Sequence, residues 1–135
     1  MEITVGMVDG VHLTVSNNSG LTASVDGTPE IGGKDKGLRP MELFLGAMAS
    51  CMSMDVLHII RKSRIEPAAY KVVVQGTRRE AVPRVFTDIK LTFCFRGDIP
   101  ENIKERAVKL SVEKYCSVRL MLKEEIKITY EISEF

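Results

Sequence analysis

Short runs of apolar and β-branched residues fill the first part of the chain and predict three strands. The runs at 2–8 and 11–16 flank Asp9-Gly10, a pair typical of two-residue hairpin turns in which the backbone needs a positive φ. A third run, at 21–26, follows a second cluster of turn-forming residues. The pattern predicts a meander of three short strands, followed by a loop at 27–39 that is rich in glycine and charge.

The segment 40–62 is apolar on almost every side of a helix, and it is rich in methionine. Pro40 suits the first helical position, where its missing N–H has no partner to lose. Glu42 lies in the first turn, where a carboxylate complements the helix dipole. These features predict a long helix that is central and buried rather than on the surface, with Cys51 in its middle.

The second half of the chain alternates between strand and helix patterns. The segment 85–97 has the two-residue period of a half-buried strand, because apolar Ile89, Leu91 and Phe93 alternate with polar neighbours. The remaining expected elements are a strand at 68–80, a helix at 98–115, a short helix at 117–123 and a strand at 125–132. We therefore expect an α+β chain that forms a single domain over residues 1–135.

The charges of the chain almost balance, with 19 basic residues, 18 acidic residues and a net charge of +1. Without a basic excess or tryptophan, the composition gives no sign of nucleic-acid binding. The N-terminus lacks the features of a signal peptide, and no run matches the roughly 18 apolar residues of a membrane span. The three widely spaced cysteines do not form a secreted disulfide framework. We expect a cytoplasmic protein that binds neither nucleic acid nor a membrane.

The three cysteines lie in different surroundings. Cys94 lies on the polar face of its strand, which is typical of a bystander. Cys51 shares a helix face with Asp55 and His58, but His58 is two turns away and cannot deprotonate the thiol directly. Cys116 lies where a helix breaks and another begins, a place where exposed N–H groups lower the pKa of a thiol. An inert buried cysteine remains an alternative for both Cys51 and Cys116.

Two segments far apart in the sequence share a pattern with a known family. The first, "RPMELFLGAMASCMSMDV", leads from Pro40 to Cys51, and the second, "YCSVRLMLKEEIKITYEI", contains Cys116 and Val118. Together they resemble the OsmC/Ohr family of thiol peroxidases. Members of that family have a proline-led helix that carries one cysteine, then a second cysteine, a short helix and a closing strand. The resemblance covers essentially the whole chain, including the three-stranded opening.

The resemblance implies an OsmC-like fold, with antiparallel sheets around a long central helix. It also implies an intertwined homodimer whose active sites form at the subunit interface. Cys51 would attack a small hydrophobic organic hydroperoxide to give a sulfenic acid, and Cys116 would condense with it to a disulfide. A dithiol reductant would then reopen the disulfide. No metal and no organic cofactor is expected.

The sequence departs from the family pattern at the charges that activate the thiol. Family peroxidases use an arginine from the N-terminal segment and a glutamate directly after the helix-start proline. Here Met41 follows the proline and the glutamate is Glu42, and one position turns a helix by about 100°. Glu42 is thus a candidate for charge positioning or for simple dipole compensation, and Arg39 for charge positioning or a solvated helix start. Ser117 replaces the usual proline after the second cysteine, and serine caps a helix start well.

The leading hypothesis is a thiol-dependent peroxidase that reduces organic hydroperoxides. The alternative is a non-catalytic small-molecule-binding or thiol-carrier protein on the same scaffold, which the altered charge pair favours. A purely structural domain is a third possibility, and it requires both Cys51 and Cys116 to be inert.

Overall fold

The computed structural model describes residues 1–135 and divides the chain into two compact units, residues 1–44 and 45–135. The single-domain organisation that the sequence suggests stays a prediction. The helix α1, Pro40–Lys62, begins in the first unit and continues through the second. Its bounds agree with those expected from the sequence.

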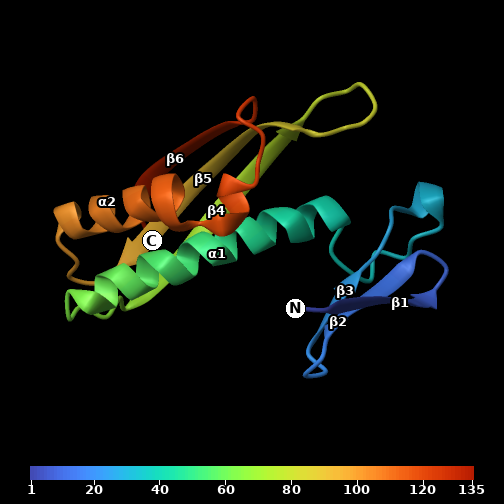
Figure 1. The fold of residues 1–135 in the computed structure, drawn as a ribbon, viewed down its shortest axis with the longest axis horizontal. Helices are drawn as coiled ribbons and strands as arrows, with labels where there is room; N and C mark the ends of the chain where they lie inside the picture. The colour runs from blue at the N-terminus through green and yellow to red at the C-terminus, as the bar shows by residue number, and fades with distance from the viewer. The chain divides into compact units, whose positions relative to one another are not determined.

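The first unit contains the expected meander. Its strands β1 (Ile3–Asp9), β2 (His12–Asn17) and β3 (Thr22–Val25) pair in chain order and antiparallel (Figure 1). Gly10 has φ of 58° in the first turn, the positive value that the Asp-Gly pair predicts. A short 3-10 helix, η1 (Pro29–Ile31), interrupts the loop that follows.

A buried carboxylate organises that loop. The side chain of Asp26 is 1% exposed and accepts hydrogen bonds from the backbone N–H groups of Gly27, Lys34 and Lys36, at 2.7, 3.0 and 3.0 Å. These N–H groups favour the charged carboxylate, so they hold the pKa of Asp26 below its ordinary value. The glycine-rich segment between strand and helix is therefore an ordered loop, closed around one acid.

The second unit is built on a sheet with the order β4-β5-β6. Its strands are β4 (Ala69–Arg78), β5 (Phe86–Arg96) and β6 (Lys127–Glu134). β4 pairs antiparallel with β5, whereas β6 pairs with β5 in parallel, so the expectation of antiparallel sheets is wrong for this edge. A parallel pair needs a long crossover, and the segment between β5 and β6, residues 97–126, supplies it.

The apolar face of β5 forms the core of this unit. Ile89, Leu91, Phe93 and Phe95 are each at most 1% exposed, as their alternation predicts. Cys94 belongs to the opposite face, with Thr92, but it is only 6% exposed. The neighbouring strands cover it, because it lies in register between Lys71 and Ser133.

The crossover carries three helical pieces. They are α2 (Glu101–Leu110), the π-helix η2 (Ser111–Tyr115) and α3 (Ser117–Leu120). Figure 1 shows α1 and α2 on the same side of the sheet. The hydroxyl of Tyr70 on β4 donates to Ser53 Oγ of α1 at 3.0 Å, and Lys104 of α2 reaches Glu134 of β6 at 3.6 Å.

Burial of α1 in the single chain is confined to one stripe, which agrees with the expectation that one chain of this size cannot cover every face of the helix. The buried residues are Met48, Ala49, Met52, Val56 and Ile60, whereas Met54 is 72% exposed. By length and composition α1 reaches the range of a membrane span, with mean hydropathy 1.7, although the sequence suggested that no segment does. Core helices of soluble proteins pass the same test, so the absence of membrane binding stays a prediction.

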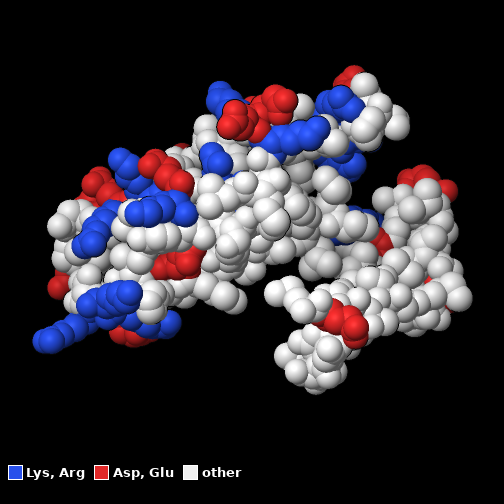
Figure 2. Space-filling model, in the orientation of Figure 1, with Lys and Arg blue, Asp and Glu red and all other residues white.

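The observed elements give an α+β class with two small sheets and few helices, as the sequence predicts. Figure 2 shows charges of both signs scattered over the visible face of the second unit, with no large area of one sign. That distribution agrees with the net charge of +1.

Candidate active site

Cys51 lies in the middle of α1, beside the buried stripe. Its side chain is partly exposed and carries a free thiol. Met48 and Met52, which flank it on the helix, are fully buried at 0% exposure. The sequence thus holds the thiol at the edge between an apolar wall and an opening.

Cys116 occupies the junction between η2 and α3. It is the N-cap residue of α3, and its sulfur accepts a hydrogen bond from the backbone N–H of Arg119 at 3.4 Å. Its Sγ lies 3.8 Å from the carbonyl oxygen of Met48 on α1, to which the thiol can donate. The residue is 0% exposed. The second thiol is therefore sealed against the helix that carries the first.

The structure brings Cys51 and Cys116 together. Burial, and to a smaller extent the interaction with the neighbouring Cys51 thiol, raise the pKa of Cys116 to about 11. The N–H of Arg119 acts in the opposite direction, but burial outweighs it. The expectation that a helix start lowers this pKa is therefore wrong: α3 is only four residues long, and the sulfur has left water.

Asp55 and His58, which share a helix face with Cys51, have separate roles. The carboxylate of Asp55 lies 3.4 Å from the hydroxyl of Ser111, whereas His58 is exposed. Both line a cavity of about 460 Å³, together with Ile59, Lys62, Ser63, Arg106, Leu110 and Tyr115.

Arg39 and Glu42 lie in the first unit, and their contacts there are local. The guanidinium of Arg39 donates to the carbonyl oxygens of Asp26 and Gly27 and pairs with the carboxylate of Asp35. Glu42 accepts a hydrogen bond from the backbone N–H of Arg39 at 2.8 Å, which is half of a capping box. A role of either residue toward the thiols stays a prediction.

Several features of the thiol region carry no recognisable signal in the sequence. The segment 111–115 has an ordinary helical pattern, yet it forms a π-turn closed by the N–H of Cys116 on the carbonyl of Ser111 at 3.0 Å. The hydroxyl of Ser111 donates to the carbonyl of Met52 at 3.0 Å. The Nε atom of Arg119 is buried and has no hydrogen-bond partner. These contacts depend on α1, so only the fold reveals them.

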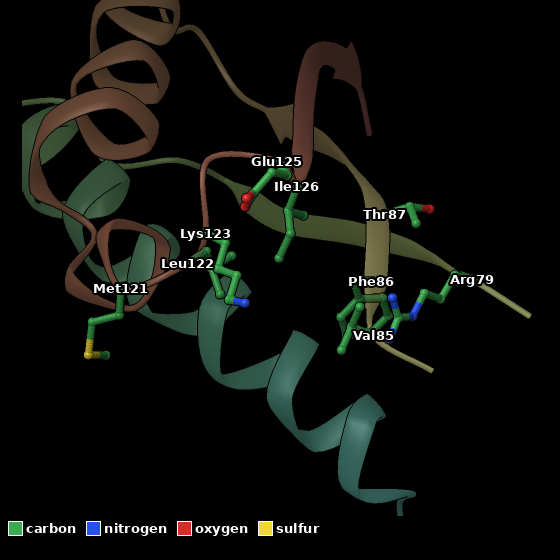
Figure 3. Close-up of a pocket in the computed structure, with 9 residues that line it drawn as sticks. All are labelled: Arg79, Val85, Phe86, Thr87, Met121, Leu122, Lys123, Glu125 and Ile126. Atoms are coloured by element: carbon green, nitrogen blue, oxygen red, sulfur yellow. The ribbon is translucent and has the colours of Figure 1, made fainter. Parts of the chain in front are cut away.

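A second cavity, of about 500 Å³, lies away from these thiols. Arg79, Val85, Phe86 and Thr87 line one side, and Met121, Leu122, Lys123, Glu125 and Ile126 line the other (Figure 3). Its walls are mostly apolar, with the cations of Arg79 and Lys123 among them. No cysteine lines it.

The remaining candidate groups are the third thiol, Cys94, and possible metal ligands. Cys94 is buried, and its sulfur lies 3.9 Å from the carbonyl of Thr92, a local contact that fits the prediction of a bystander. No group of three or more His, Cys, Asp or Glu side chains is placed to hold a metal ion.

The chain matches one family and several known proteins. The model of the OsmC-like protein family matches residues 33–131. Protein YhfA of Escherichia coli K12 is 38% identical over 131 residues, which are 96% of this chain and 95% of that protein. A hypothetical protein from Aquifex aeolicus is 34% identical, with a TM-score of 0.82 over 99% of this chain and 96% of the other. An organic hydroperoxide resistance protein from Legionella pneumophila shares the fold, with 17% identity and a TM-score of 0.71 over 98% and 97% of the two chains.

Proposed function

Because the chain belongs to the OsmC-like family, we propose that it is a thiol-dependent peroxidase that reduces small organic hydroperoxides. The observation that carries the proposal is the contact between Cys51 and Cys116, two free thiols that are 65 positions apart, from 51 to 116. The name of the Legionella relative, an organic hydroperoxide resistance protein, agrees with this role. The proposed peroxide chemistry rests on the contact between the two cysteines and on the name of this relative.

The proposed reaction has two steps, formation of a sulfenic acid and formation of a disulfide. The thiolate of Cys51 attacks the distal oxygen of the hydroperoxide, so that an S–O bond forms, the O–O bond breaks and the alcohol leaves. The Cys116 thiol then loses its proton as its sulfur attacks the sulfenic sulfur, so that the disulfide forms, the S–O bond breaks, and the hydroxide leaves as water with that proton. A dithiol reductant returns the two electrons and restores both thiols.

The difference in exposure supports these two roles. Cys51 is partly exposed, so a peroxide can reach it, whereas Cys116 is 0% exposed. With its pKa raised to about 11, Cys116 is a neutral thiol at neutral pH. A neutral thiol can donate a hydrogen bond to the Cys51 thiolate, so the buried partner supports the first step and carries out the second.

The surroundings of Cys51 indicate the substrate and partners. Cys51 lies on a helix that is almost wholly apolar and rich in methionine, which suits a small hydrophobic peroxide better than hydrogen peroxide. The large apolar side chain of Met54 on α1 is 72% exposed in the single chain, which supports a homodimer. A dithiol reductant and a cytoplasmic location belong to the same proposal.

A non-catalytic small-molecule-binding protein is the second candidate. The cavity of about 500 Å³ beside Phe86 and Leu122 favours it, because that cavity has apolar walls and no thiol. The local contacts of Arg39 favour it as well, since they occupy the arginine that the peroxidase needs to activate its thiol.

One experiment separates the two candidates. The reduced protein is treated with one equivalent of cumene hydroperoxide, and its thiols are mapped by mass spectrometry. We expect a Cys51–Cys116 disulfide within seconds, loss of peroxide consumption in Cys51→Ser, and a trapped sulfenic acid in Cys116→Ser. Cys94→Ser is the matched control and should behave as the wild type. Slow oxidation of all three cysteines, or full activity of Cys51→Ser, would contradict the peroxidase.

A further inference from the structure

We propose that Ser111 is a positioning residue that holds Cys116 against α1 so that the second thiol closes on Cys51. The inference rests on the proposed function, in which these two sulfurs form a disulfide. Ser111 touches neither sulfur, and it acts through the backbone of the segment that carries Cys116.

The hydroxyl of Ser111 attaches the crossover to α1. Ser111 is 0% exposed, and its hydroxyl donates to the carbonyl oxygen of Met52 at 3.0 Å. The carboxylate of Asp55, at 3.4 Å, is a second acceptor for the same hydrogen. Both acceptors belong to α1, within one turn of Cys51. The attachment point is therefore next to the reacting thiol.

The backbone of Ser111 transmits this attachment to Cys116. Its carbonyl accepts the N–H of Cys116 at 3.0 Å and closes the π-turn of residues 111–115. A π-turn is wider than an α-turn and occurs frequently at functional sites. Ser111 is thus bound to α1 through its hydroxyl and to Cys116 through its carbonyl. Together these two hydrogen bonds fix the position of Cys116 relative to α1.

The second attachment of this segment is the thiol of Cys116 itself. Its sulfur lies 3.8 Å from the carbonyl of Met48, one turn before Met52 on the same side of α1. Cys51 lies between these two positions in the sequence. Two buried contacts to adjacent turns of α1 therefore hold the crossover beside Cys51. When Cys116 reacts, its thiol loses the contact to the Met48 carbonyl. The Ser111 hydroxyl is the contact that persists.

This role predicts a selective effect on the second chemical step. In Ser111→Ala the first thiol keeps its surroundings, because Ser111 does not contact it. The second thiol loses its placement, and a small misplacement of a reacting group costs about tenfold to a hundredfold in rate. The sulfenic acid therefore lives longer, and excess peroxide converts more of it to sulfinic acid.

The first measurement separates the two steps in Ser111→Ala by rapid mixing with cumene hydroperoxide and trapping of the sulfenic acid. We expect sulfenic acid formation within about twofold of the wild type, disulfide formation slowed about tenfold or more, and increased sulfinic acid. Ser53→Ala is the matched control, because the Ser53 hydroxyl, like that of Ser111, donates to a backbone carbonyl of α1, that of Ala49, and it also accepts from Tyr70. It should leave both steps unchanged. Equal slowing of both steps, or wild-type closure in Ser111→Ala, would overturn the proposal.

A second measurement is independent of peroxide chemistry. The equilibrium between the reduced pair and the Cys51–Cys116 disulfide is measured in a glutathione redox buffer, which gives the effective concentration of one thiol at the other. We expect Ser111→Ala to lower it about tenfold and Ser111→Thr, which keeps the hydroxyl, to restore most of it. If the wild type forms this disulfide but no sulfenic acid, the peroxidase proposal fails while the positioning role stands. An unchanged equilibrium constant in a folded Ser111→Ala protein would exclude the positioning role alone.

Discussion

The thiol region and the helix-start region use their polar groups in opposite ways. At the helix start, Arg39 and Glu42 both have local partners: Asp35 and two carbonyls hold the guanidinium, and Glu42 caps the helix. Around Cys116, polar contacts converge on a sulfur that is free and buried, and the nearby Arg119 keeps an unpaired buried Nε. Charged groups that all have hydrogen-bond partners stabilise the fold. A site that keeps a free thiol and a hydrogen-bond donor without a partner is instead suited to a reaction.

The difference between the regions explains the departures from the family pattern. The altered positions, Arg39 and Glu42, are those whose side chains the first unit uses for its own loop and helix start. The two cysteines, which the pattern preserves, meet in the second unit. We therefore expect substitutions in the thiol region to change reaction rates and substitutions at the helix start to change stability.

The largest expected effect is the pH dependence of disulfide closure. The pKa of Cys116 is raised to about 11. At any pH below that value, a rise of one pH unit therefore increases the thiolate fraction of Cys116 about tenfold. Closure after one equivalent of peroxide should accelerate by about a thousandfold between pH 7 and pH 10. Rapid-mixing measurements with a trap for the sulfenic acid follow this step directly.

The free energy of unfolding should fall as the pH rises, whereas the rate of disulfide closure should increase, and this opposite trend provides a control. A thiol whose pKa is raised from 9.0 to about 11 by burial stabilises the native state below pH 9. That contribution is lost as the pH rises from 9 to about 11. Urea unfolding of the wild type should show this loss, and Cys116→Ala should lack its share. A closure rate that is flat from pH 7 to 10 would contradict the buried neutral thiol.

The next effect compares the two arginines. Arg119→Gln should slow sulfenic acid formation about tenfold, because it removes a buried, unpaired cationic donor from the residue whose backbone N–H bonds to Cys116 Sγ. Arg39→Gln should leave that rate within about twofold and lower the free energy of unfolding by about 1–2 kcal/mol, since it removes hydrogen bonds to a charged group. Stopped-flow oxidation and urea unfolding measure the two quantities.

A reversed result is equally informative. If Arg39→Gln slows the oxidation of Cys51 and Arg119→Gln does not, the first unit supplies the activating charge, as the resemblance to the family peroxidases implies. Lys36→Gln is a suitable control for net charge, because it removes one cation from the same loop as Arg39.

The comparison also shows what the sequence could predict. The ends of α1 follow from local signals, since Pro40 begins the helix and a polar run ends it. The strands follow from short-range alternation and turn residues. The π-turn does not, because residues 111–115 suit an α-helix and widen only where Ser111 bonds to Met52. The direction of the Cys116 pKa shift depends on burial under α1, which no local pattern records.

The smallest expected effect concerns Glu42 and separates its charge from its hydrogen bond. Glu42→Ala should cost about 1 kcal/mol of stability, because it removes both the cap on the Arg39 N–H and the first-turn charge. Glu42→Gln keeps an acceptor for that N–H, so its cost should be about 0.3–0.5 kcal/mol. Neither variant should change the rate of Cys51 oxidation. A tenfold loss of that rate in Glu42→Gln, at unchanged stability, would move the carboxylate from the helix start into the thiol chemistry and remove the division between the two regions.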